Sequence, residues 1–178
     1  MDIPFNAPQG YRWHGSDAVL AAVLIPDGWY VHEHTKGSVH EVLAFLPDHE
    51  HPGECHAALT LNAMHHVSRV LGITARSYGA QSVKTIKGRH QTLFDVETAM
   101  EEGTMSWAVR FRSVLSATPR IVHRYMLADD GDDLLRWCTF EAPEDRWKQA
   151  WPTGEFILRH LCMVLSLDVP SPEGEQLH

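Results

Sequence analysis

Residues 103–147 constrain the fold of this chain more than any other stretch, because apolar and polar residues alternate there in three successive segments. Side chains of a β-strand point alternately to opposite faces, so each segment is predicted to be a strand with one buried face. An acidic turn at residues 129–133, which contains Asp-Gly, separates the last two segments and is typical of a β-hairpin. The stretch therefore predicts an antiparallel meander followed by a helix that opens at Pro143, where a missing N–H is tolerated.

The segments on either side of the meander predict more strands and two helices. An apolar run at residues 17–25 is short enough for a strand buried on both faces, although a buried helix also fits its alanines and leucines. Helical spacing predicts a helix over residues 73–86, and Pro152 with Gly154 predicts a break in the last helix. Alternation predicts further strands at residues 30–34, 39–46, 56–64 and 90–100.

Length and composition indicate one globular domain. The chain has 178 residues, of which 44% are hydrophobic and 21% charged, both ordinary values for a soluble protein. Residues 1–16 predict an irregular N-terminal arm, residues 17–168 the domain, and residues 169–178 a flexible tail. The expected fold class is α+β, with a twisted antiparallel sheet of about six strands and helices packed on it.

Charge, cysteine content and hydropathy exclude several classes of protein. A formal net charge of -8 argues against a nucleic-acid binder. Three widely spaced cysteines do not form a disulfide framework and suit a reducing compartment. The N-terminus has no basic region and no long apolar core, and no run of 18 apolar residues is present. We therefore expect a cytoplasmic protein with neither a secretory leader nor a membrane span.

Two short motifs resemble those of the PsbP-like superfamily. A Pro-x-Gly-Trp motif after the first apolar strand and an Ala-Pro-x-x-x-Trp motif at the last helix are matched by Pro26, Gly28 and Trp29, and by Ala142, Pro143 and Trp147. The superfamily includes PsbP, a Ran-binding nuclear import factor, LpqN-type lipoproteins and the DcrB-like proteins that contain the Eag secretion chaperones. The resemblance implies an α/β/α sandwich, no shared catalytic machinery, and binding to other proteins.

The leading functional hypothesis is a non-enzymatic protein-binding module, because the sequence has neither a Gly-x-Ser-x-Gly motif nor a glycine-rich phosphate loop. Such a module would act as a chaperone or adaptor for a secreted or membrane-associated partner, and would accept its apolar or membrane-destined segment. An exposed edge strand would also permit a homodimer. The residues predicted to contact the partner are Trp107, Arg110, Arg112, Arg124 and Trp151.

Four arginines of the meander offer a second reason to expect a partner. If they shared one face of the sheet they would form a basic patch for an acidic partner. The alternative is a solvated face on which neighbouring carboxylates balance the charge. The four are Arg110, Arg112, Arg124 and Arg136.

The histidines suggest an alternative function as a metal-binding protein or metal-dependent enzyme. His32 and His34 would lie on one face of a strand, and His49 and His51 would lie in a polar loop, as ligands for zinc. No spacing matches a recognised zinc signature, so the simpler interpretation is a set of surface histidines and no cofactor is expected. A third hypothesis is a small-molecule binding protein with its pocket between the sheet and the last helix.

Overall fold

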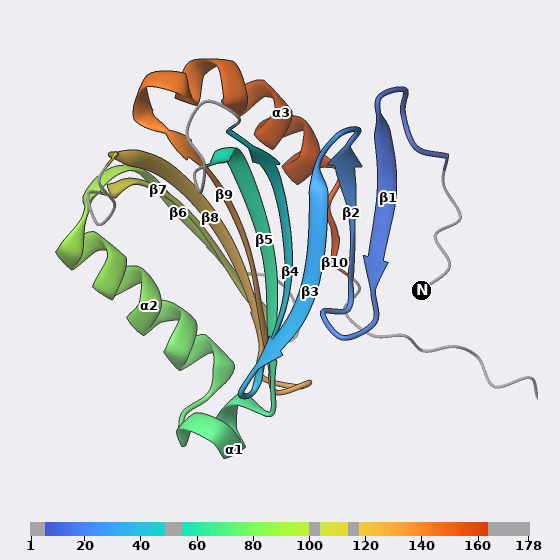
Figure 1. The fold of residues 1–178 in the computed structure, drawn as a ribbon. Coiled ribbons are helices and arrows are strands. Elements are labelled where there is room, and N and C mark those ends of the chain that lie inside the picture. The colour runs from blue at the N-terminus through green and yellow to red at the C-terminus, as the bar shows by residue number, and fades with distance from the viewer. Residues whose placement is uncertain (1–5, 49–54, 100–103, 114–117, 164–178) are drawn as a thin grey trace, which may run out of the picture.

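A seven-stranded antiparallel sheet forms the centre of the molecule (Figure 1). A computed structural model describes residues 6–48, 55–99, 104–113 and 118–163. The sheet confirms the predicted α+β class but has seven strands instead of about six. In spatial order the strands are β3 (Tyr30–Lys36), β4 (Val39–Pro47), β5 (Cys55–His65), β9 (Leu134–Pro143), β8 (Arg120–Asp129), β7 (Thr104–Ser113) and β6 (Gln91–Ala99).

The predicted meander is confirmed by the pairing of its strands. Strand β7 pairs with β8 and β8 pairs with β9, both antiparallel. In the acidic turn, the Asp129 carboxylate accepts hydrogen bonds from the backbone N–H groups of Gly131 and Asp132, at 2.8 and 3.1 Å. This side chain closes the turn locally, which explains why the sequence signal for the hairpin is strong.

A second, three-stranded sheet packs beside the first and corrects the prediction of an irregular N-terminal arm. Strands β1 (Tyr11–Ser16), β2 (Ala21–Pro26) and β10 (Cys162–Met163) form it, with β2 in the middle. Strand β2 is the predicted buried strand, and Val23, Leu24 and Ile25 are each 0% exposed. A buried strand needs hydrogen-bond partners for its backbone, and β1 and β10 supply them.

Helices cover both faces of the large sheet (Figure 1). Helix α1 (Val67–Leu71) and helix α2 (Ala75–Arg89) follow β5, and α2 packs on strands β6 to β9. The side chain of Thr74 caps α2 by accepting a hydrogen bond from the Ser77 N–H at 3.2 Å. On the opposite face, a 3-10 turn (Glu144–Arg146) leads into helix α3 (Trp147–Arg159), so the layers are helix, sheet and helix.

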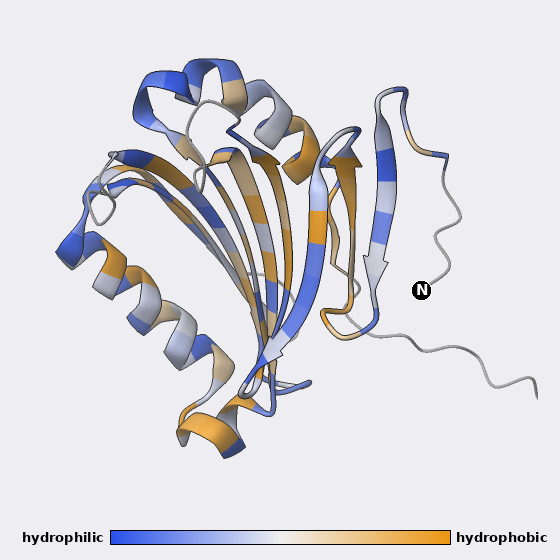
Figure 2. Cartoon of the chain, viewed as in Figure 1, coloured by the Kyte–Doolittle hydropathy of each residue, from blue (hydrophilic) through white to orange (hydrophobic). Residues whose placement is uncertain are grey.

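Two apolar layers hold these elements together, one on each face of the large sheet. Helix α3 and strand β2 share a core with β4, β5 and β9, whereas α2 covers Trp107 and Met126 on the other face. Figure 2 shows the contrast between the hydrophobic strand β2 and the more polar helix α2.

Helix α3 is continuous through Pro152, so the predicted break is wrong. The helix is held by contacts on both sides of the proline, because Trp147, Trp151 and Ile157 all pack against the core. Gly154 does not interrupt it either. A Cβ atom at Gly154 would lie only 2.6 Å from the Phe140 ring, so this glycine allows the helix to approach strand β9 closely.

Gly154→Ala is therefore expected to destabilise the protein by about 1–3 kcal/mol, because the new methyl group overpacks the contact with Phe140. The matched control is Gly88→Ala in helix α2, where an added Cβ meets nothing within 4 Å. That control should gain about 0.5–1 kcal/mol. Urea unfolding of both variants checks the prediction, and equal effects at the two glycines would contradict it.

Candidate functional site

The register of the meander separates the arginines that the sequence predicted as one patch. Residues directly opposite each other in an antiparallel pair share a face. Arg110 lies opposite His123, whereas Arg124 lies opposite Val109. Arg110 and Arg112 are therefore on the α3 face and Arg124 is on the α2 face, so a single basic patch does not form.

Arg136 also does not contribute to a basic surface. It lies on the α3 face, where its side chain is 1% exposed. Its Nη1 donates to the backbone oxygen of Leu20 at 3.2 Å, and burial lowers the pKa of the guanidinium, with Asp129 and Asp132 opposing that change. Arg136 therefore links the large sheet to the turn between β1 and β2, and it does not face solvent.

Trp107, predicted to contact a partner, belongs to the core. It is 2% exposed beneath helix α2. A Cβ atom on Gly79 would lie 2.5 Å from its ring, and its indole N–H donates to the Glu97 carboxylate at 2.9 Å. Because both the ring and its polar atom are occupied within the chain, Trp107 offers no surface to a partner.

Three of the other four predicted contact residues, Arg110, Arg112 and Trp151, lie together on the α3 face. The Arg110 guanidinium lies 3.9 Å from the ring centre of Trp151 and 5.3 Å from that of Trp147. His123 packs on the same Trp151 ring at 5.0 Å, and we call these four residues the Arg110 cluster. Burial lowers the pKa of Arg110, which Glu155 partly offsets. Arg112 lies next to the cluster, bonded to the Glu144 carboxylate at 2.7 Å.

Strand β6 presents an apolar surface beside this cluster. It is an outer strand of the large sheet, and its side chains Leu93, Phe94 and Val96 are 49%, 46% and 46% exposed. Phe94 lies opposite Arg110 on the α3 face and stacks on His123 at 6.3 Å. We call these three residues the β6 surface. The alternation of the strand was visible in the sequence, but its place at the edge was not.

Two of the four predicted zinc ligands, His32 and His34, lie within the described residues, and each contacts a side chain of strand β4. His32 stacks on Phe45 at 5.8 Å, and His34 pairs with Glu41 at 3.1 Å. His49 and His51 lie outside the residues that the structure describes. Within the described part of the chain, no group of three histidine, cysteine or acidic side chains is placed to hold a metal ion.

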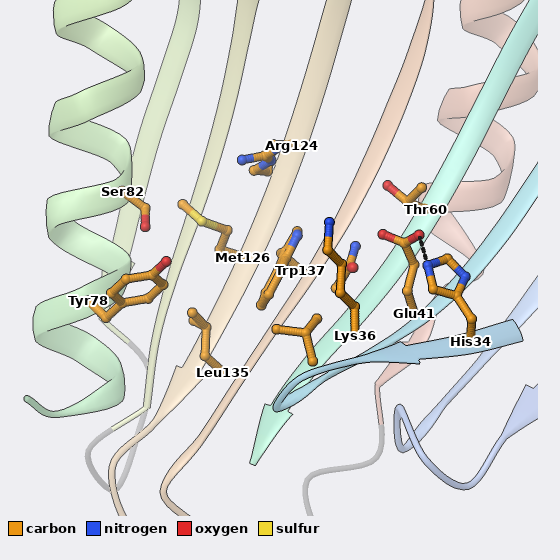
Figure 3. A pocket seen from close by; sticks show the side chains of 12 residues that line it. His34, Lys36, Glu41, Thr60, Tyr78, Ser82, Arg124, Met126, Leu135 and Trp137 are labelled. Atoms are coloured by element: carbon orange, nitrogen blue, oxygen red, sulfur yellow. Dashed lines mark ion pairs between the residues drawn. The ribbon is translucent and has the colours of Figure 1, made fainter. Parts of the chain in front are cut away.

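A cavity of about 500 Å³ with an amphipathic lining lies beside helix α2, on the part of the sheet that the helix leaves uncovered (Figure 3). We call it the α2 cavity. Side chains from β3, β4, β5, β8, β9 and α2 line it, and His34 and Glu41 form an ion pair in its wall. Its lining includes Lys36, Val39, Thr60, Asn62, Tyr78, Ser82, Arg124, Met126, Leu135 and Trp137.

A smaller cavity of about 340 Å³ lies where the third hypothesis placed a pocket, between the sheets and helix α3. Tyr11, Trp29 and Arg146 are among its lining residues. The Arg146 guanidinium donates to Asp48 at 3.1 Å and also contacts His56, so its charge is balanced inside the chain. We therefore regard the α2 cavity as the stronger candidate for a ligand site.

Among the described helices, none has the length and hydropathy to cross a membrane.

Comparisons with known proteins identify the fold. No protein-family model matches the sequence, and no protein of curated function is significantly similar to it. A cyanobacterial PsbP from Synechocystis sp. PCC 6803 matches with a TM-score of 0.58 at 14% identity, over 92% of this chain and 98% of that one. The Saccharomyces cerevisiae Ran-binding protein Mog1p matches at 0.52 and 8% identity, over 86% and 95% of the two chains.

A third solved structure, a Pseudomonas aeruginosa protein of unknown function, matches with a TM-score of 0.51 at 10% identity, over 88% of this chain and 99% of that one. Identities this low carry the fold and nothing more specific. The three matches cover nearly the whole of each solved chain, so the likeness extends to the full architecture. The chain has the fold of the PsbP-like proteins that its two motifs resemble.

Proposed function

We propose that this protein is a non-enzymatic protein-binding module, and that an extended segment of its partner docks on the β6 surface. The observation that carries the proposal is the exposure of Leu93, Phe94 and Val96 on one edge strand. Large apolar side chains gathered in the open are typical of interaction sites. The Ran-binding function of Mog1p, which has the same fold, is consistent with a protein partner.

The backbone of β6 is suited to such a partner. Among the described strands, β7 is the only one that pairs with β6, so the outer row of N–H and C=O groups is open to a further strand. An extended segment added there would gain main-chain hydrogen bonds, while its side chains provide specificity.

The side chains of β6 indicate which face the segment would use. On the α2 face, Asp95 pairs with Lys87 and Glu97 accepts from the Trp107 indole, so both acids are held by the chain itself. On the α3 face, Phe94 and Val96 are open beside the Arg110 cluster. Apolar and polar residues should therefore alternate along the partner segment, with the apolar residues on the α3 side of the sheet.

An alternating apolar segment is what a secreted or membrane-destined protein exposes before it folds or inserts. A module that covers such a segment would act as a chaperone or adaptor, and it would meet its partner in the cytoplasm before export. This part of the proposal rests on the chemistry of the β6 surface.

Val96→Lys is expected to weaken partner binding about tenfold or more. The substitution removes the apolar contact that Val96 would make with the partner, and it places a charge in the interface. Val70→Lys on helix α1 is the matched control, since Val70 is also 46% exposed but lies away from β6. A photo-crosslinking residue placed at position 96 or at position 70, in the native host, identifies the bound protein. The dissociation constant is then measured with that purified partner.

The proposal requires crosslinking from position 96 to a specific protein and a loss of affinity confined to Val96→Lys. Equal effects of the two lysine variants would contradict it, as would crosslinks from position 70 alone. If position 96 crosslinks only to a second copy of this chain, and the wild type is a dimer by light scattering, the β6 surface is a homodimer contact and the adaptor proposal fails.

A further inference from the structure

The α2 cavity exists because one helix cannot cover a seven-stranded sheet. Seven strands span about 29 Å across the sheet, whereas a helix with its side chains is about 10–12 Å wide. Helix α2 packs on β6 to β9 and leaves the α2-side surface of β3, β4 and β5 without a helix on it. Side chains of that surface, together with side chains of α2, β8 and β9, line a space of about 500 Å³. This volume is within the range of small-molecule sites.

Two cations of this cavity have unused hydrogen-bonding capacity. Arg124 donates through Nε to the Thr139 hydroxyl at 3.0 Å, and its Nη groups donate to no other described residue. Lys36 makes no ion pair with any residue that the structure describes. Burial lowers the pKa of Arg124, while Glu141 and Tyr78 oppose that change. Glu141 is not part of the cavity lining and pairs with Arg120 at 3.2 Å.

The single carboxylate of the cavity is already satisfied. Glu41 Oε1 pairs with His34 Nε2 at 3.1 Å. With the Asn62 amide oriented to donate to Glu41 Oε2 at 2.9 Å, the amide oxygen accepts from the Trp137 indole N–H at 3.1 Å. Both carboxylate oxygens are thus occupied by the chain. Lys36 and Arg124 against Glu41 leave the lining with a net charge of +1 when His34 is neutral, although the whole chain carries -8.

The remaining lining is amphipathic. Tyr78, Ser82 and Thr60 bring hydroxyl groups, and Figure 3 shows the Tyr78 and Ser82 side chains projecting from helix α2. The apolar contribution comes from Val39, Met126, Leu135 and the ring of Trp137. A partly buried guanidinium with free N–H groups, such as that of Arg124, recognises oxyanions, which accept its hydrogen bonds and balance its charge.

We propose that the α2 cavity binds a small organic molecule that carries a carboxylate or phosphate next to an apolar body. Arg124 and Lys36 bind the oxyanion, and the Trp137 wall contacts the apolar part. This site is on the opposite sheet face from Phe94 and Val96, so it is independent of partner docking at the β6 surface.

The test is an NMR titration of the ¹⁵N-labelled full chain with phenyl phosphate, benzoate and benzylammonium. The first two probes distinguish phosphate from carboxylate as the preferred oxyanion, and benzylammonium carries the same ring with the opposite charge. We expect at least one anion to shift the backbone signals of residues 36, 78, 82, 124 and 137, and benzylammonium to leave them unchanged.

Lys36→Gln should weaken the binding of that anion about fivefold, as expected for the loss of one charge at close range. Lys84→Gln is the matched control, because Lys84 is exposed on helix α2 and does not line the cavity. Arg124→Gln should abolish binding, and its spectrum shows directly whether it is folded. If Arg124→Gln is unfolded, the comparison of the two lysine variants decides the test.

The proposal is overturned if benzylammonium binds as well as the anions, or if Lys36→Gln and Lys84→Gln behave alike. It is also overturned if neither anion shifts the cavity signals at about 10 mM, or if the shifts appear around Arg146 in the smaller cavity instead. Val96→Lys should titrate like the wild type, which separates this site from the β6 surface.

Discussion

Trp107→Ala is expected to lower the free energy of unfolding by about 3–5 kcal/mol, as for other large aromatic residues removed from a core. The ring is 2% exposed, and it packs with Met126 and Leu135 beneath helix α2. The substitution also leaves the Glu97 carboxylate without its indole donor. Urea unfolding followed by circular dichroism measures the loss.

The control for this prediction is Tyr30→Ala, because Tyr30 is a large aromatic residue that is 56% exposed. It should cost no more than about 1 kcal/mol. A loss below about 1 kcal/mol for Trp107→Ala would show that the residue is not a core residue. The sequence-based hypothesis that it contacts a partner would then regain support.

Acidification should destabilise the protein through His123. This side chain is 8% exposed, and burial, with the positive charge of Arg110 as a smaller cause, lowers its pKa from 6.5 to about 4. Phe94 and Trp151 also pack on the ring and offer no charge to stabilise the imidazolium form. The folded protein therefore resists protonation at this position more strongly than the unfolded chain does.

The sign of the effect follows from proton binding. Above pH 6.5 the histidine is neutral in both states, and between pH 6.5 and 4 the unfolded state binds more protons, so stability falls as the pH falls. The lowering of the His123 pKa from 6.5 to about 4 corresponds to a loss of about 3 kcal/mol, most of which has occurred by pH 4.

The measurement is urea unfolding at pH 7, 6, 5 and 4 for the wild type and for His123→Phe, which keeps a ring but cannot titrate. We expect the stability difference between the two proteins to change by about 3 kcal/mol across this range. His32→Gln, at an exposed histidine, should follow the wild type. Parallel curves for the wild type and His123→Phe would contradict the assignment.

The parts of the fold that were predictable from the sequence are those with strong local signals. The meander was predicted because three alternating segments and an Asp-Gly turn agree with one another. Strand β1 was missed because Tyr11–Ser16 is a short segment that contains Gly15 and follows Pro8 and Gly10, which favour an irregular chain. Its strand conformation depends on pairing with β2, which is a tertiary interaction.

The sequence predicts which side chains of one strand share a face of the sheet, but it does not predict which side chains of two neighbouring strands share a face. Alternation correctly separated Arg110 from Trp107 within β7 and His123 from Arg124 within β8. Which face of β8 matches which face of β7 depends on the register across the connection, and a shift of one residue exchanges the faces. The sequence therefore could not show that Arg110 and Arg124 lie on opposite sides of the sheet.

The candidate sites show the same limit. The contact between Arg110 and Trp151 joins residues from β7 and α3, and the α2 cavity combines residues from six elements. Residue types alone suggested arginine and tryptophan as contact residues, and three of the five lie together on the α3 face. The exposed side chains of β6 could not be predicted, because alternation does not reveal which strand is at the edge.

The most direct test of the proposed function is hydrogen exchange of the full chain, alone and with the purified partner identified by crosslinking. Partner docking on the β6 surface predicts slower exchange of the backbone amides of residues 91–99, since the outer row of β6 would become hydrogen-bonded. Unchanged exchange along β6, with protection instead at strand β3 or helix α1, would contradict the proposed docking surface.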